Sequence, residues 1–156
     1  MRKNLARLFA LPVALALAAC AGRPVTGPSN PDAVGVPLLT AHGAWRVVSV
    51  HDGKGQPLPP TDANYRLQFV GQEITIHGGC NRMFSRYRVD RDMLRIEPLA
   101  STRMACAHEL MAMDTAIGDL LSPKPLTLAI AGTQPLLLTL TTAAGDVLLL
   151  AAMAQQ

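Results

Sequence analysis

Residues 78 to 106 read GGCNRMFSRYRVDRDMLRIEPLASTRMAC, and this stretch decides the fold. It opens on a glycine pair followed by Cys80 and Asn81, and it closes on Cys106. Runs of strand-forming residues lie on both sides of it. We therefore expect a hairpin region, stapled between its two cysteines, around which a small β domain closes.

Residues 1–19 have the pattern of a bacterial lipoprotein signal peptide. Basic residues precede an apolar run at residues 8–17, and Leu-Ala-Ala-Cys follows at residues 17–20. The pattern predicts that Cys20 becomes the mature N-terminus and carries acyl chains such as palmitate. A membrane-spanning helix is the rival interpretation, but it needs about 20 apolar residues, and the run here is shorter and contains Pro12.

Signal-peptide removal changes the charge balance of the chain. The full sequence holds 14 Lys and Arg against 11 Asp and Glu. The signal peptide contains three of the basic residues and none of the acids, so the mature chain has 11 of each. A formally neutral chain gives no reason to expect a nucleic-acid partner.

Residues 20–43 are expected to form the lipidated cysteine and a flexible tether. The segment is rich in small and polar residues, and prolines are spaced so that no regular element is expected. These prolines are Pro24, Pro28, Pro31 and Pro37. In enterobacterial lipoprotein sorting, an Asp beside the lipidated cysteine retains a protein in the inner membrane. Ala21 stands there instead, so the resemblance implies an outer-membrane anchor with the domain facing the periplasm.

Residues 44–154 are enough for one domain with one core. Short alternating runs separated by turn signals predict a mainly β (α+β) fold, a small antiparallel barrel-like sheet of about eight strands with one helix. Closure of such a sheet removes its exposed edges. The expected strands are 45–51, 65–69, 73–77, 86–89, 93–97, 126–131, 136–142 and 147–152, and the expected helix is 107–121.

The apolar patterns also predict which faces are buried. In the first strand, simple alternation places Trp45, Val47 and Ser49 on one face. The helix carries an apolar stripe at spacings of three and four residues. Its members are Leu110, Met113, Ile117, Leu120 and Leu121.

The chain has three cysteines, and Cys20 is assigned to the lipid. The remaining pair, Cys80 and Cys106, lies in an oxidising compartment and is expected to form a disulfide. Two alternatives stay open. The pair can be free or redox-active thiols, or it can join His77 and His108 around a tetrahedral metal.

Arginines crowd the central stretch, and Arg82 and Arg103 flank its two motifs. Arginine binds phosphate and carboxylate groups in a bidentate manner, so one interpretation is a site for an anionic lipid or an acidic partner. Interleaved acids favour an ordinary solvated face instead. Asn81 follows the glycine pair and is expected to be a turn or capping residue. We treat Asn81, Arg82 and Arg103 as candidate motif or binding residues.

No catalytic constellation is present in the sequence. It contains no Gly-x-Ser-x-Gly, phosphate loop or His-Glu-x-x-His motif. Ser101, His108 and Asp114 have no spacing that indicates a triad. Met104, Met111 and Met113 are expected to fill the core, although methionine clusters also bind copper(I). We expect a non-enzymatic protein without catalytic residues, cofactor or metal.

Several of these residues together resemble the META domain family, that of the heat-shock protein HslJ. They are Trp45 before a strand, the Phe69 strand, Gly79-Cys80-Asn81, Tyr87, the run from Ser101 to Cys106 and the helix after it. The resemblance runs from about residue 45 to residue 150 and implies a β-rich, barrel-like fold with one helix. Members are often periplasmic or outer-membrane lipoproteins linked to envelope stress and resistance to hydrophobic antibiotics. The fold is similar to that of pilot lipoproteins that hold acyl chains. The family has no established catalytic residues to carry over.

The resulting hypothesis is a lipid-anchored envelope protein that binds an envelope partner or an apolar ligand and contacts the membrane through Cys20. It predicts an apolar cavity inside the barrel. One alternative is a structural or chaperone-like stress protein without a defined ligand. Another is a thiol-redox protein, which would require Cys80 or Cys106 to be reactive.

Overall fold

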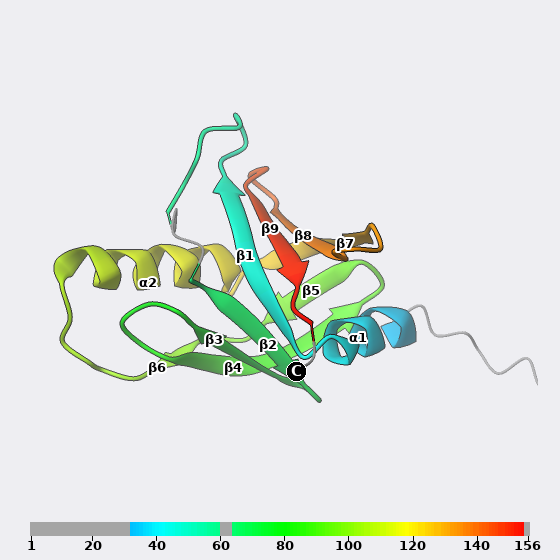
Figure 1. Cartoon of the computed structure of the whole chain (residues 1–156), viewed down its shortest axis with the longest axis horizontal. Helices are drawn as coiled ribbons and strands as arrows, with labels where there is room; N and C mark the ends of the chain where they lie inside the picture. The colour runs from blue at the N-terminus through cyan, green and yellow to red at the C-terminus, as the bar shows by residue number, and fades with distance from the viewer. Residues whose placement is uncertain (1–31, 60–63, 155–156) are drawn as a thin grey trace, which may run out of the picture.

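The computed structural model of the chain describes residues 32–59 and 64–154. The predicted signal peptide, the lipidated Cys20 and most of the predicted tether lie outside the described residues. Within them the chain forms nine strands and two helices (Figure 1). The strands are β1 (Ala44–His51), β2 (Arg66–Val70), β3 (Glu73–His77), β4 (Met83–Asp90), β5 (Met93–Ile96), β6 (Ala100–Ser101), β7 (Pro125–Ala131), β8 (Leu137–Thr142) and β9 (Val147–Ala152), and the helices are α1 (Asp32–Ala41) and α2 (His108–Leu121).

The sheet is an antiparallel barrel. Its strand order is β3-β2-β1-β9-β8-β7-β5-β4, and pairing of β3 with β4 closes the ring. All eight expected strands are present, which confirms the predicted fold class. The short strand β6 was not expected. It pairs with the start of β4, on the side where β5 pairs with the end of the same strand.

Alternating apolar side chains fill the barrel. In β2 and β3 the inward residues are those that the sequence pattern predicts, and they are fully buried. They belong to one continuous core, which occupies the space where an apolar cavity was expected. Among the most completely buried members are Trp45, Leu67, Phe69, Ile74, Ile76, Leu94, Ile96, Leu126, Leu138 and Leu150.

A β-bulge in β1 changes the predicted face of that strand. The register with β9 shifts between Val47 and Ser49, so Val48 is an extra residue and remains exposed. As a result Val50 points inward and is 3% exposed, in place of Ser49. The expectation of simple alternation through Ser49 was therefore wrong, because a bulge moves every later side chain to the opposite face.

Helix α1 contradicts the prediction that the tether continues to residue 43. Leu39 is completely buried, and the Trp45 Nε1 atom donates a 2.9 Å hydrogen bond to the Leu39 carbonyl. Pro37 lies inside the helix and lacks one backbone donor. The burial of Leu39 and the Trp45 bond outweigh that loss. The folded domain therefore begins no later than α1.

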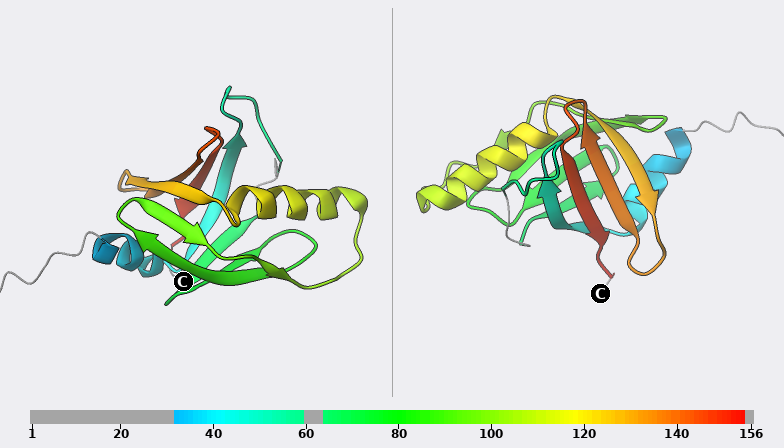
Figure 2. Two further views of the ribbon diagram at one scale, coloured as in Figure 1. Left: turned by 180° about the vertical axis from the view of Figure 1, so that it is seen from behind. Right: turned by 90° about the horizontal axis from the view of Figure 1, so that it is seen from above.

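Helix α2 lies against the barrel through its C-terminal half, and its N-terminal end projects beyond the strands (Figure 2). Ile117, Leu120 and Leu121 are buried, as predicted. Leu110 is 40% exposed, so its place in the predicted stripe was wrong. None of the helices in the described part of the chain is long and apolar enough to cross a bilayer.

Two neighbouring leucines provide a matched test of the docking of α1. Replacement Leu39→Ala removes a fully buried side chain and should lower the free energy of unfolding by about 2 to 4 kcal/mol. Leu38→Ala alters a side chain that is 36% exposed and should cost less than about 1 kcal/mol. Urea unfolding monitored by Trp45 fluorescence measures both. Equal losses would contradict the docking of α1 through Leu39.

Candidate functional site

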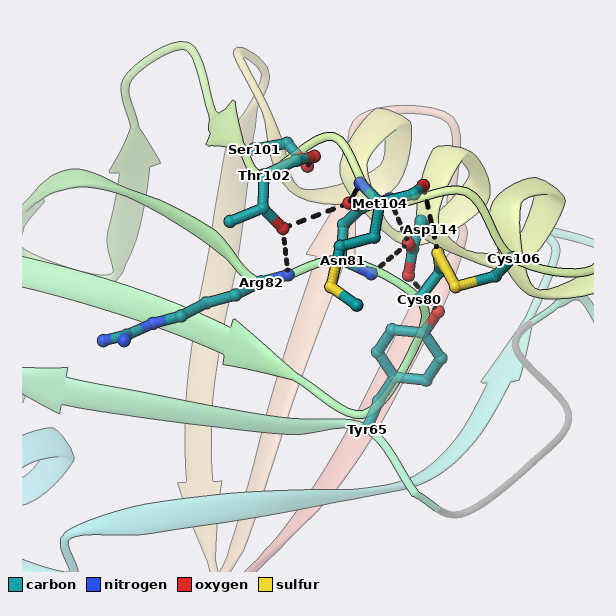
Figure 3. The surroundings of a disulfide bond; sticks show 9 residues. All are labelled: Tyr65, Cys80, Asn81, Arg82, Ser101, Thr102, Met104, Cys106 and Asp114. Atoms are coloured by element: carbon teal, nitrogen blue, oxygen red, sulfur yellow. Dashed lines mark hydrogen bonds between the residues drawn. A yellow bond between two sulfur atoms is a disulfide. The ribbon is translucent and has the colours of Figure 1, made fainter.

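The carboxylate of Asp114 is the centre of a polar network between α2 and the barrel (Figure 3). Asp114 is 7% exposed although it carries an acidic side chain. Its Oδ1 atom accepts a 2.6 Å hydrogen bond from the Tyr65 hydroxyl. Its Oδ2 atom accepts bonds from the backbone N–H and the side-chain amide of Asn81, at 2.7 and 3.2 Å. A buried carboxylate requires such donors, because its desolvation is otherwise too costly.

The glycine pair before Cys80 makes this approach possible. Gly78 has a φ of +127°, and a Cβ there would overlap the backbone of Asn64. A Cβ on Gly79 would overlap both the Asp114 carboxylate and the Tyr65 hydroxyl. The pair is therefore required by the backbone conformation at the first position and by close packing at the second.

Asn81 connects this network to the second motif. Its Oδ1 atom accepts hydrogen bonds from the Met104 backbone N–H at 2.8 Å and from the Thr102 hydroxyl at 3.0 Å. The Thr102 hydroxyl oxygen in turn accepts a bond from the Arg82 backbone N–H. Asn81 is thus more than a local turn residue: its side chain joins the Gly-Cys-Asn segment to the Thr-Arg-Met segment.

The disulfide between Cys80 and Cys106 is present, with Cα atoms 5.9 Å apart. It closes a loop with a sequence separation of 26 residues, which stabilises by about 3 to 4 kcal/mol on the chain-entropy estimate. Because both sulfurs are bonded to each other, neither is a thiolate ligand for the metal site considered above. The described residues contain no group of three or more His, Cys, Asp or Glu that could hold a metal ion.

The two candidate arginines keep their side chains out of this network. Arg82 joins the network through its backbone, and its side chain extends away from it (Figure 3). Arg103 has an exposed side chain. Neither guanidinium forms a hydrogen bond or an ion pair among the described residues. The network therefore uses Asn81 from the predicted set but not the side chains of the two arginines.

Sequence reasoning missed Asp114, Tyr65 and Thr102 as members of the site. A signal for Asp114 existed, because it lies three residues before Ile117 and seven before Leu121 on the buried side of the helix. An acid on an apolar stripe predicts a buried partner. No pattern in the sequence identifies Tyr65 or Thr102 as that partner, since both come from distant segments.

Burial shifts two titratable groups near this region. Burial is the main reason, and the hydrogen bond to Asp114 the second, that the pKa of Tyr65 is raised far above its ordinary value. The pKa of His77 is lowered mainly by burial, and further by the positive charges of Arg82 and Arg66. Tyr65 is therefore a permanent donor to Asp114 at physiological pH, and His77 is mostly neutral there.

An open groove of about 450 Å³ lies beside the network, between α2 and residues 98–101. Met111 lines it and is 38% exposed, and Met104, bonded through its backbone to Asn81, is 61% exposed. The expectation of core packing was therefore wrong for Met104 and Met111, whereas Met113 packs against the core as expected. The residues that line the groove are Asn81, Met83, Pro98, Leu99, Ser101, Met111, Asp114, Thr115, Gly118, Asp119, Ser122 and Pro123.

Comparison with known proteins gives a family match and two similar structures. A family model described as the META domain matches residues 37–155. An NMR structure of a protein from Burkholderia xenovorans is similar over 90% of this chain and 100% of its own, with 19% identity and a TM-score of 0.68. A second NMR structure is similar over 74% of this chain and 93% of its own, with 25% identity and a TM-score of 0.51. No curated protein matches the sequence significantly.

Replacement of Asp114 should destabilise the domain. Asp114→Ala leaves the Tyr65 hydroxyl and the Asn81 amides without their acceptor, so the free energy of unfolding should fall by about 2 to 4 kcal/mol. Asp119→Ala, an exposed position on the same helix, should change it by no more than about 0.5 kcal/mol. Chemical denaturation compares the two. A similar small effect for both would show that the network contributes little.

Tyr65 should also make the domain less stable in alkali. In the unfolded chain a tyrosine loses its proton near pH 10, whereas the folded state keeps it. The unfolded state then binds fewer protons, so stability falls as pH rises above that value. Tyr65→Phe should weaken this dependence, and Tyr87, whose pKa is also raised by burial, should leave a residual slope. Urea midpoints between about pH 9 and pH 11 test this, and an unchanged slope would contradict it.

Proposed function

The chain belongs to the META domain family, and we propose that it is a non-enzymatic, lipid-anchored cell-envelope protein whose barrel binds a partner protein. The partner enters the groove between α2 and residues 98–101. The observation that carries the proposal is the exposure of Met111 in the groove lining, together with that of Met104, whose backbone is bonded to the groove-lining Asn81. Large apolar side chains gathered at a groove are typical of a binding surface.

The features of the groove favour one kind of occupant, an apolar segment of an envelope protein that also bears a basic residue. Pro98, Leu99 and Pro123 provide an apolar lining. Asp119 lies at the same groove, is exposed, and has no ion-pair partner in the described part of the chain. A lysine or arginine in the partner would complement that carboxylate.

A rigid base supports this use of the surface. Asn81 and Asp114 both line the groove and are fixed by the network, while the disulfide anchors the segment that leads into α2. Little ordering is then required when a partner binds, which favours affinity. An open groove suits a protein segment better than a small apolar ligand, which usually enters an enclosed pocket.

The envelope location rests on the sequence. The basic residues, short apolar run and Leu-Ala-Ala-Cys before residue 21 support lipidation of Cys20. Ala21 supports an outer-membrane destination with the barrel in the periplasm. The proposed absence of catalysis rests on the lack of a recognisable catalytic motif in the sequence.

A chaperone-like role in envelope stress is the second candidate, and the same methionines favour it. Methionine is flexible and polarisable, so it is frequent on surfaces that bind many partners. Such a protein would hold varied apolar segments without selecting one. A thiol-redox role is less favoured, because Cys80 is 8% exposed and bonded to Cys106.

Site-directed photocrosslinking tests the proposed function in intact cells. A photoreactive amino acid in place of Met111 should crosslink the lipidated protein to one discrete envelope protein. The same probe in place of Val48, which is exposed on β1, is the matched control and should give no such product. A Cys20→Ala chain that carries the probe at Met111 should lose both its membrane association and the product.

Each outcome separates the candidates. One product specific to Met111 supports the partner-binding function, whereas a broad set of products that grows under envelope stress supports the chaperone-like role. Products in equal amount from Val48, or none from either position, would overturn the groove as the binding surface. Retention of the Cys20→Ala chain in the membrane would overturn the lipid anchor.

A further inference from the structure

A row of basic side chains crosses the outer face of three strands, away from the groove lining. Arg46 on β1 is directly opposite Arg66 on β2, and Arg66 is directly opposite His77 on β3. Arg46 and Arg66 are exposed and His77 is half-buried. Residues directly opposite each other in an antiparallel pair lie on the same face, with Cβ atoms about 5 Å apart. The three side chains therefore stand together on one surface.

This arrangement opposes the stability of the barrel. Like charges directly opposite each other in neighbouring strands repel. In the ranges 32–59 and 64–154, neither Arg46 nor Arg66 forms an ion pair or a side-chain hydrogen bond that would offset the repulsion. A pair of like charges that has no compensating partner among the described residues is a reason to look for a ligand that provides the compensation.

The two arginines also line one small pocket. Its volume is about 190 Å³, and Asn64 and Met153 complete its lining. This volume lies below the range of about 300 to 1,000 Å³ that is usual for drug-sized ligands, but it accommodates a single small anion. Two guanidinium groups provide planar, bidentate donors for such an anion, and the Asn64 amide can add another donor.

Among the described residues of this face, the charges beside the two arginines are positive. The charges of Arg82 and Arg66 reach His77, where they help burial to lower its pKa. Along β2 and β3 the nearest outward acid in register is Glu73, opposite Val70 at the far end of the pair. Neutral Gln68 and Thr75 lie between Glu73 and the basic row. The pocket therefore lies at the basic end of this face.

We propose that Arg46, Arg66 and Asn64 form a binding site for a phosphate group on the outer face of β1 and β2. The phosphate can belong to a soluble phosphate compound or to the headgroup of an anionic phospholipid. The guanidinium groups bind its oxygens through charge-assisted hydrogen bonds, and the bound anion relieves the repulsion between the arginines. This site is independent of the proposed partner-binding groove.

Titration of the full-length chain in a nonionic detergent tests the site. Inorganic phosphate represents the soluble source, and dihexanoyl phosphatidylglycerol represents the headgroup, with dihexanoyl phosphatidylcholine for comparison. NMR signals of Arg46, Arg66 and Asn64 should shift on binding. The double variant Arg46→Gln/Arg66→Gln should weaken binding at least about tenfold, as expected for the loss of charge-assisted hydrogen bonds.

The matched control is Arg88→Gln/Arg95→Gln. These two arginines are also exposed and directly opposite each other, on β4 and β5, so the control removes the same charge in the same kind of pair. It should change the affinity by less than about twofold. Both double variants should melt no lower than the unaltered chain, because each removes a like-charge pair.

Tighter binding of phosphatidylglycerol than of inorganic phosphate or phosphatidylcholine assigns the site to a headgroup. Binding of inorganic phosphate at least as tight as that of phosphatidylglycerol assigns it to a soluble phosphate compound. The proposal is overturned if neither probe shifts the three signals, or if the Arg88 and Arg95 control weakens binding as much as the Arg46 and Arg66 variant. A melting temperature lowered only in the Arg46→Gln/Arg66→Gln variant would show that Arg46 and Arg66 stabilise the barrel instead.

Discussion

A buried carboxylate with a complete set of donors is the constraint on which this end of the molecule depends. Asp114 accepts hydrogen bonds from Tyr65, which immediately precedes β2, and from Asn81, which precedes β4. The helix can therefore dock in only one rotation and at one height against the barrel. Bonds to an ionised acceptor are among the stronger hydrogen bonds in proteins, and their loss would leave a charge out of water without partners.

This constraint explains why the central motifs have their sequence. Gly79 must lack a side chain because the Asp114 carboxylate and the Tyr65 hydroxyl occupy the space where its Cβ would lie. Asn81 must offer both donors and an acceptor, since it serves Asp114 on one side and the Met104 segment on the other. The disulfide holds the same two segments covalently. The motifs therefore specify one rigid contact between the barrel and α2. This contact also holds the groove beside it in a fixed shape.

The sequence pattern predicted the strands better than it predicted the contact between the barrel and α2. Alternation identifies β2 and β3 because one face of each strand is buried and the other is solvated. It fails at Val48, where a bulge depends on the partner strand, and at α1, where burial of Leu39 overrides the proline signal. Local residue preferences report local conformation. They do not report contacts with distant segments, and those contacts decide both exceptions.

The same distinction applies to the site. Asn81 and the cysteines could be selected from the sequence because they stand in short motifs. The role of Tyr65 depends on its contact with Asp114 on α2, and the role of Thr102 depends on its contact with Asn81 before β4. Arg82 and Arg103 were selected for their charge, but the two arginines that share a pocket, Arg46 and Arg66, lie far apart in the sequence. Only strand register brings them together.

The early start of the folded domain has a geometric consequence. Eleven residues, positions 21 to 31, separate Cys20 from the beginning of α1, and even a fully extended chain of that length spans only about 40 Å. In the proposed lipid-anchored form, a short tether keeps the barrel close to the bilayer. A tether of this length confines the binding surface to a thin layer next to the membrane, which raises its effective concentration for partners within that layer. Partners that lie further from the membrane are out of its reach.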